Sequence, residues 1–352
     1  MDSTRQHDRR WNESVLATRT ADRQHYVPRL HLSRFERNGL IQAYDLKDDR
    51  CFESSPTNLA VEKGYNDFVL GGQVSVSTED WLADVESRAA PFLSKLVEDP
   101  SAIESVDVAD EIYLARYLAA QKFRAPGFRE FQRQVREQMI EDVKPIAKSY
   151  IQNTLPKGEA DELWDYWKEK PEEWWLNEEK PPDDAEGAAR MLSEVQGWAN
   201  LLVAANWRTG YSRDLSLYTC DNPLAEYLPP IRPWYAGGGA IWEHGYVFAL
   251  SPEVLLWVYP LGYEKEVAEH GSRTYQDFSR WEASLARHII TRNATRFLFG
   301  KGPYVSPPCA QQCLARIDDI NLLIAMRLQG HDPRRPKGGA TESVTKLLEG
   351  SS

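Results

Sequence analysis

The chain has 352 residues and a net charge of −11, and 42% of its residues are hydrophobic, with 12 Trp, 16 Tyr and 11 Phe. This length and apolar content are enough for a large core, which excludes a wholly disordered chain. The negative charge disfavours nonspecific binding of nucleic acid by the surface as a whole, and leaves room only for a local basic groove. No apolar run reaches about 18 residues, so no membrane partner is expected.

The two ends of the chain are predicted to lie outside the folded body. Residues 1–22 are polar, with mixed charge and no apolar signal region, and we interpret them as a flexible arm of a cytoplasmic protein. Residues 330–352 are rich in Gly, Pro and charge, which is typical of a disordered tail. Residues 23–329 are expected to form a single domain.

The four cysteines, Cys51, Cys220, Cys309 and Cys313, are too few for a disulfide framework in a chain of this length. Cys309 and Cys313 have no second pair nearby, so their spacing does not indicate a zinc site. We interpret the cysteines as buried free thiols. Motifs for phosphate loops, dinucleotides, zinc proteases and serine hydrolases are missing, so the sequence predicts no metal and no particular cofactor.

The first part of the body is predicted to be a small mixed α+β element. Residues 40–46 partly alternate apolar and polar positions after an Asn-Gly turn, and residues 51–56 can pair back as a second strand. Residues 55–68 begin with Ser-Pro, and we expect a short capped helix there that closes at Gly64.

The middle of the chain is predicted to be helical. Residues 77–99 carry apolar side chains at helical spacing, and residues 107–143 continue as a helix that Pro126 should kink or divide. A third helix is expected over residues 188–207. Residues 150–187 are interpreted as a partly helical, Trp-rich insertion, because residues 158–187 hold twelve acidic residues against three lysines.

After Trp207 the pattern favours strands. Short strands are expected over residues 215–220 and on both sides of Ser251-Pro252, and a closing helix is expected within residues 278–300. The fold class predicted from this order is α+β, with a helical middle layer packed on a small, mainly antiparallel sheet built from both ends of the chain.

Three polar segments are candidates for chemistry. Pro28 stiffens the backbone that presents Gln24, His25 and Tyr26, and a histidine of near-neutral pKa can shuttle protons. An alternative is that His25 is hydrogen-bonded inside the core and Tyr26 packs. His31 and the flanking arginines are interpreted as surface or packing positions.

The other two segments place polar groups before a proline. Gln121 and Arg124 share one face of a helix that ends at Pro126, and Arg124 can clamp a carboxylate or phosphate or form a buried ion pair. Asp221 and Asn222 follow a strand and precede Pro223, where they can bind a ligand or cap a turn.

The order of these segments resembles a known family. Over roughly residues 23–300 the chain resembles the pattern of domain of unknown function 4238 (DUF4238). The residues that carry the resemblance are Gln24-His25-Tyr26-Val27-Pro28 with Phe35, Tyr44-Asp45, Ser55-Pro56, Gln121 with Arg124 and Pro126, Asp221-Asn222-Pro223 and Leu250-Ser251-Pro252. The resemblance implies a mainly bacterial family without a settled activity. The acidic insertion and the glycine-rich segment 236–240 look like additions to the family pattern.

Residues that belong to one pattern on separate segments often converge at a site. We therefore predict a hydrolase-like pocket, as in a nuclease of a bacterial toxin or defence system. In it His25 is the general acid or base, Arg124 the anion clamp and Asp221 the orienting carboxylate or a metal ligand. The substrate-binding residues in this prediction are Gln24, Tyr26, Gln121 and Asn222. The alternative is a noncatalytic binding or regulatory module in which the same residues form a structural network.

Overall fold

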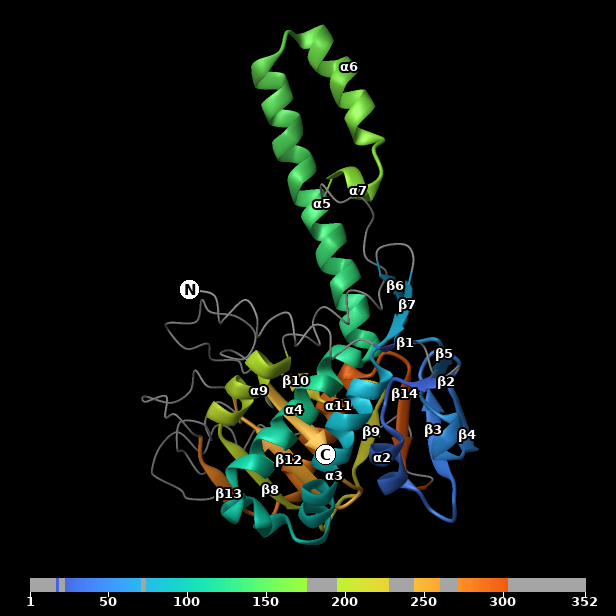
Figure 1. The fold of residues 1–352 in the computed structure, drawn as a ribbon, viewed down its shortest axis with the longest axis vertical. Coiled ribbons are helices and arrows are strands. Elements are labelled where there is room, and N and C mark those ends of the chain that lie inside the picture. Colours follow the sequence, from blue (N-terminus) through green and yellow to red (C-terminus); the bar gives the residue numbers. More distant parts are fainter. Residues whose placement is uncertain are drawn as a thin grey trace, which may run out of the picture.

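The computed structural model describes residues 17–18, 23–70, 74–175, 195–227, 244–259 and 271–302 (Figure 1). A five-stranded sheet with the order β10-β11-β12-β8-β13 lies at the centre of the body. Its strands are β8 Trp207–Tyr211, β10 Ala225–Tyr227, β11 Gly245–Ala249, β12 Val254–Val258 and β13 Arg273–Tyr275. All its pairings are antiparallel except that of β13 with β8, which is parallel.

Both faces of the central sheet are buried, which explains why β11 and β12 are apolar throughout. Successive side chains of a strand point to opposite faces. Phe248 and Leu256 accordingly pack into the core under the helices, whereas Val247 and Leu255 pack into a second core on the other face.

The helical layer over one face confirms the helices expected in the middle of the chain. It consists of α3 Glu79–Glu98, η3 Pro100–Ser105, α4 Val108–Arg124 and α9 Val195–Ala204. The predicted division at Pro126 is also confirmed, because α4 ends at Arg124 and α5 starts at Pro126. Proline is tolerated at the first helical position, since the amide N–H that it lacks has no partner within the helix there.

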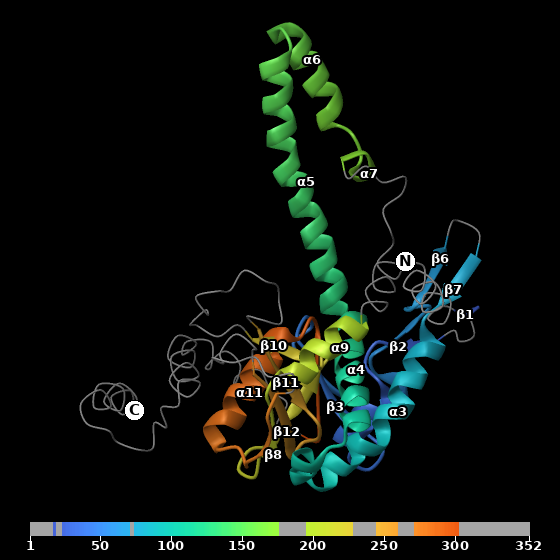
Figure 2. The ribbon, with the colours of Figure 1, turned by 60° about the vertical axis from the view of Figure 1, so that its left-hand side comes forward.

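A helical hairpin projects away from the body in Figures 1 and 2. Its long arm is α5 Pro126–Thr154, and its return arm consists of α6 Lys157–Lys168 and α7 Glu172–Trp175. The described part of the predicted insertion at residues 150–187 belongs to this hairpin. Residues 188–194 of the third expected helix lie outside the described residues. α9 Val195–Ala204 forms most of the remainder, and Trp207 already belongs to β8.

A second sheet, of order β4-β3-β14-β9, joins segments from both ends of the domain. Its strands are β3 Ile41–Asp45, β4 Arg50–Ser54, β9 Tyr218–Cys220 and β14 Phe297–Gly300. The α+β class is therefore confirmed, and a sheet drawn from both ends is present, but the helical layer packs on the central sheet instead. The closing helix is present as α11 Arg280–Asn293, but the segment 278–300 ends with β14, a strand that the sequence pattern did not predict.

The helix predicted over residues 55–68 is wrong. The segment contains a 3₁₀ turn, η2 Pro56–Asn58, and then the strand β5 Val61–Lys63, which pairs with β2 Arg23–His25. Ala60, between the two, has a φ of 50°, which no right-handed helix accommodates. The remaining elements are α2 Arg29–Leu32, η1 Ser33–Phe35 and a three-stranded sheet of β1 Ala17–Thr18, β6 Asp67–Leu70 and β7 Val74–Ser77.

Cys220 is buried as expected, but Cys51 on the edge strand β4 is exposed, so the prediction of a buried thiol is wrong for Cys51. Cys309 and Cys313 lie outside the described residues, as do the predicted disordered tail 330–352 and nearly all of the predicted arm 1–22. No helix in the described ranges has both the length and the apolar character needed to cross a membrane.

Candidate functional site

Gln24 is fully buried and joins β2 to the hairpin of β6 and β7. Its Nε2 donates to Asp67 and, at 3.4 Å, to Ser77 Oγ, while its Oε1 accepts from the backbone N–H of Asn66 at 2.5 Å. Each polar atom of the Gln24 amide therefore has a partner within the protein.

His25 and Tyr26 are held by the segment that follows β4. His25 Nε2 lies 3.3 Å from the carbonyl oxygen of Pro56, and burial is the main cause that lowers the pKa of this imidazole. The Tyr26 N–H donates to the carbonyl of Ala60 at 2.9 Å, and the Tyr26 ring packs 5.2 Å from the ring of Tyr65. Burial raises the pKa of the Tyr26 hydroxyl.

Arg124, the last residue of α4, contacts the segment that contains His25 and Tyr26. Its Nε donates to the carbonyl oxygen of Tyr26 at 3.1 Å, and its Nη1 pairs with Glu86 Oε1 at 2.5 Å. The Arg124 side chain is only 3% exposed, and that of Glu86 is 23% exposed. Arg124 therefore lies beside residues 24–28, which we call the opening segment. Its guanidinium forms a buried ion pair with Glu86 there.

Asp221 lies after β9 and accepts three backbone N–H groups from the segment that precedes and begins β14. Its Oδ1 accepts from Thr295 at 2.8 Å, and its Oδ2 accepts from Arg296 at 2.7 Å and from Phe297 at 3.0 Å. Burial raises the pKa of the Asp221 carboxyl to about 6, although these hydrogen bonds oppose the shift. No hydrogen bond in the described part of the chain joins His25, Arg124 and Asp221 to one another.

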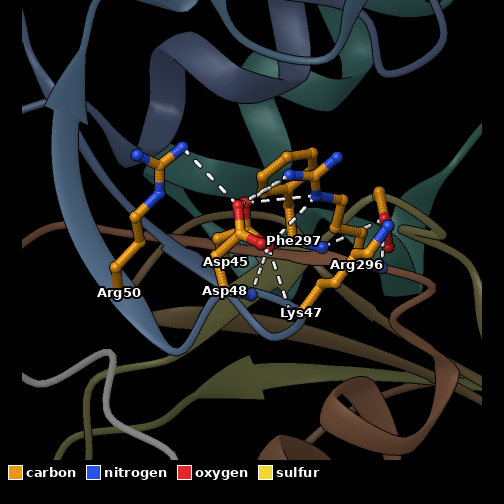
Figure 3. Close-up of polar contacts among 7 residues, drawn as sticks. Asp45, Lys47, Asp48, Arg50, Arg296 and Phe297 are labelled. Carbon is orange, nitrogen blue, oxygen red and sulfur yellow. Dashed lines mark hydrogen bonds and ion pairs between the residues drawn. The ribbon is translucent and has the colours of Figure 1, made fainter.

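Arg296, whose backbone N–H donates to Asp221, also binds Asp45 on β3 with its side chain (Figure 3). Arg296 Nε lies 3.1 Å from both carboxylate oxygens of Asp45, and its Nη2 lies 2.7 Å from Asp45 Oδ2. Asp45 is fully buried and also accepts the backbone N–H groups of Lys47 and Asp48. The hydrogen bond from Arg296 is the main cause that lowers the pKa of Asp45 to about 2.

The lowered pKa of Asp45 predicts that part of the protein's stability is lost in acid. Because the pKa of Asp45 is lower in the folded protein than its ordinary 3.8, its contribution is fully present above pH 4 and is lost as the pH falls toward 2. Asp45→Asn is expected to lower the free energy of unfolding at pH 7 by about 2 kcal/mol. Urea unfolding of both proteins at a series of pH values should show that this difference shrinks below about pH 4. A difference that stays constant down to pH 2 would contradict the assignment.

A cavity of about 880 Å³ opens where the α4–α5 junction meets β10 and α11. Its size falls in the range of roughly 300–1,000 Å³ that is usual for small-molecule sites. The side of the cavity formed by the helices is aromatic, with Phe128, Phe131 and Trp198 among its lining residues. The ring centroids of Phe128 and Phe131, both on α5, lie 6.4 Å apart.

Two buried polar side chains line the cavity without a hydrogen-bond partner among the described residues. Gln121 is completely buried, and neither its Oε1 nor its Nε2 is paired. His288 is 5% exposed, and neither of its ring nitrogens is paired. Burial lowers the pKa of His288, which favours the neutral form of this imidazole. Unpaired buried polar atoms are costly, and they recur at sites that a ligand completes.

A charged cluster forms another part of the wall. Glu226 on β10 contacts Lys122 Nζ with Oε2 and His244 Nδ1 with Oε1. Burial lowers the pKa of Lys122 to about 8. The carboxylate at His244 Nδ1 selects the tautomer whose proton lies on that nitrogen. Arg292 adds an exposed cation at the edge of the cavity.

Asn222 lines the cavity and holds its two sides together. Its Oδ1 accepts from the Gly127 N–H at 2.8 Å, and its Nδ2 donates to Thr295 Oγ1 at 2.9 Å and to the carbonyl of Asn293. A Cβ atom at position 127 would overlap the Asn222 amide, so glycine is required at this point of α5. Of the seven predicted site residues, Gln121 and Asn222 lie at the cavity.

A family model described as Protein of unknown function (DUF4238) matches residues 23–301. The chain belongs to the DUF4238 family. No match was found among the curated proteins or among the solved structures. The match covers every residue that the sequence analysis assigned to the site, and it also covers the cavity of this DUF4238 domain.

Four titratable residues of the cavity were not predicted from the sequence: Lys122, Glu226, His244 and His288. They come from segments that are far apart in the chain and form no local motif. The one available signal was His288 in the run Leu285-Ala286-Arg287-His288-Ile289, where an imidazole shares an apolar helix face. Nowhere in the described ranges of this DUF4238 protein do three or more His, Cys, Asp or Glu side chains gather as a metal site.

Proposed function

We propose that this protein is a noncatalytic binding module whose ligand is a small planar ring compound held in the cavity. The observation that carries the proposal is the pair of buried, unpartnered polar side chains, Gln121 and His288, that line the same cavity. A ligand that hydrogen-bonds to both removes the cost of leaving them unpaired.

The aromatic side of the cavity favours a flat ring with polar edges. Phe128, Phe131 and Trp198 offer ring surfaces for stacking or edge contacts. The Gln121 amide has a donor and an acceptor side by side, and this arrangement complements the edge of a nucleobase or of an aromatic carboxamide.

The network of the other predicted site residues also supports a binding module. Gln24, Arg124 and Asp221 use their polar atoms to hold separate segments together. Their catalytic or substrate-binding roles, and that of His25, remain predictions.

The experiment measures ligand binding by wild type and Gln121→Leu, using saturation-transfer NMR with adenine, cytosine, uracil and nicotinamide as probes. Because the amide has no partner in the described protein, Gln121→Leu is expected to leave the stability unchanged or to raise it by about 1 kcal/mol. It should weaken binding of the ring compound at least tenfold, which corresponds to about 1.4 kcal/mol.

The matched control is Gln152→Leu, at an exposed position of α5 that does not line the cavity. This variant should have the stability and the ligand affinity of wild type. If none of the four compounds gives saturation transfer with wild type, or if Gln121→Leu binds as well as wild type, the proposal is wrong. A large loss of stability in Gln121→Leu would mean that this amide has a structural role.

A second candidate function is hydrolysis in the same cavity, with nuclease activity as its specific form. The contact of Glu226 with His244 favours it, because a carboxylate on Nδ1 orients a histidine as a general base. Incubation of the same samples with single-stranded DNA, RNA and p-nitrophenyl acetate distinguishes the two functions. Turnover that Glu226→Gln abolishes would favour the hydrolase, whereas binding without turnover would favour the module.

A further inference from the structure

The projecting hairpin carries an exposed apolar stripe. Of the eleven large hydrophobic side chains that are exposed in the described residues, six lie on α5: Phe131, Val135, Met139, Val143, Ile146 and Tyr150. Their exposed fractions range from 39% at Val143 to 69% at Ile146. Steps of three and four residues place all six on one face of the helix.

This face is not the one that α6 covers. The buried residues of α5 are Ile140 and Ile151, and they lie roughly 120° around the helix from the centre of the stripe at 100° per residue. Figures 1 and 2 both show the hairpin pointing away from the sheets and their helices. No other described element therefore covers the stripe.

The spacing of the stripe is nearly the same when read from either end. In an antiparallel pair of α5 helices, Phe131, which also lines the cavity, faces the partner's Tyr150. Val135 then faces the partner's Ile146, and Met139 faces the partner's Val143. Such self-complementarity is what a two-fold symmetric contact requires, because each surface must fit its own copy.

Asp142 is a charged side chain on the same face as the stripe, at 100° per residue. In the same register Asp142 comes close to the partner's Asp142 beside the two-fold axis. This contact between like charges lowers the affinity of the pair.

We propose that two copies of this chain associate through α5, packed antiparallel about a two-fold axis near Met139 and Val143. The stripe is about 30 Å long at 1.5 Å per residue. A helix pair of this length buries roughly 1,000 Å², near the lower limit of specific interfaces. The dimer is therefore expected to dissociate reversibly on dilution.

The test uses the full chain and measures its mass by analytical ultracentrifugation over a range of concentrations. Wild type should shift from monomer to dimer as the concentration rises. Val135→Lys and Ile146→Glu should each weaken self-association at least tenfold, because each places two charges in the apolar contact. Val108→Glu, at an exposed apolar position on α4 outside the stripe, is the matched control and should dimerise like wild type.

Mixing the two variants tests the register. In an antiparallel pair, Lys at position 135 of one copy faces Glu at position 146 of the other, so the mixture should dimerise more tightly than either variant alone. In a parallel pair these positions do not meet. Thermal unfolding followed by circular dichroism should give the wild-type midpoint for all variants, since the substituted side chains are exposed.

Three outcomes would overturn the proposal. Wild type that stays monomeric at every concentration would show that the stripe serves another partner or another segment of the chain. Equal dissociation of the Val108→Glu control would mean that the contact lies elsewhere. Dissociation of both single variants without recovery on mixing would exclude the antiparallel register.

Discussion

Asp221→Ala is expected to lower the free energy of unfolding by about 3–5 kcal/mol, because it leaves three backbone N–H donors without their acceptor. The carboxylate is 1% exposed, and it accepts the N–H groups of Thr295, Arg296 and Phe297. Alanine leaves all three donors without their acceptor at the entry to β14. Urea unfolding followed by circular dichroism measures the loss.

The matched control for this variant is Asp214→Ala, at an exposed position outside β9 and β14. We expect a change within about 0.5 kcal/mol for this surface position. If Asp221→Ala were as stable as wild type but inactive in an assay of the protein, the role of Asp221 would be catalytic, as the sequence pattern predicts. A large loss of stability instead identifies a structural carboxylate.

Arg124→Met is expected to lower the free energy of unfolding by about 2–4 kcal/mol, because it removes a buried charge and two hydrogen bonds. Methionine retains most of the side-chain volume, so the loss reports on the contacts of Arg124 with Glu86 and with the Tyr26 carbonyl. The remaining Glu86 is partly exposed, which keeps the effect below that of a fully buried unpaired charge.

The control for this change is Arg88→Met on α3. Arg88 also pairs with a carboxylate, at 2.8 Å from Asp84, but both side chains are more than half exposed. Exposed pairs contribute about 0–1 kcal/mol, so this variant should remain close to wild type. Equal effects of the two substitutions would contradict the assignment of Arg124 as a buried link between α4 and the opening segment.

The parts of the fold that the sequence predicted are those with strong local signals. Helical spacing identified α3 and α4, and Pro126 marked the α4–α5 boundary, because each of these features acts within a few residues. The strand β5 was predicted as a helix because its state depends on β2, which lies almost forty residues earlier in the chain.

The candidate site was less predictable for a similar reason. The segments of Gln121 and Asn222 stand out because each precedes a proline, and both residues line the cavity. Glu226 and His288 line the cavity only because β10, α4 and α11 lie close together in the fold. No local sequence pattern predicts that these elements are neighbours. The polar partners of Asp221 are backbone N–H groups, and a sequence gives no sign of which of them a carboxylate will accept.

The position of β14 has a consequence for the order in which the chain is synthesised. β14 hydrogen-bonds to β3 on one side and to β9 on the other, although about 250 residues separate its start from the end of β3 in the chain. While the ribosome is still producing α4 and the hairpin, β3 has an open edge whose eventual neighbour does not yet exist. Open strand edges are templates for pairing with other chains. The nascent protein therefore passes through a long interval in which its first sheet is incomplete, and this interval ends only when Phe297–Gly300 emerges.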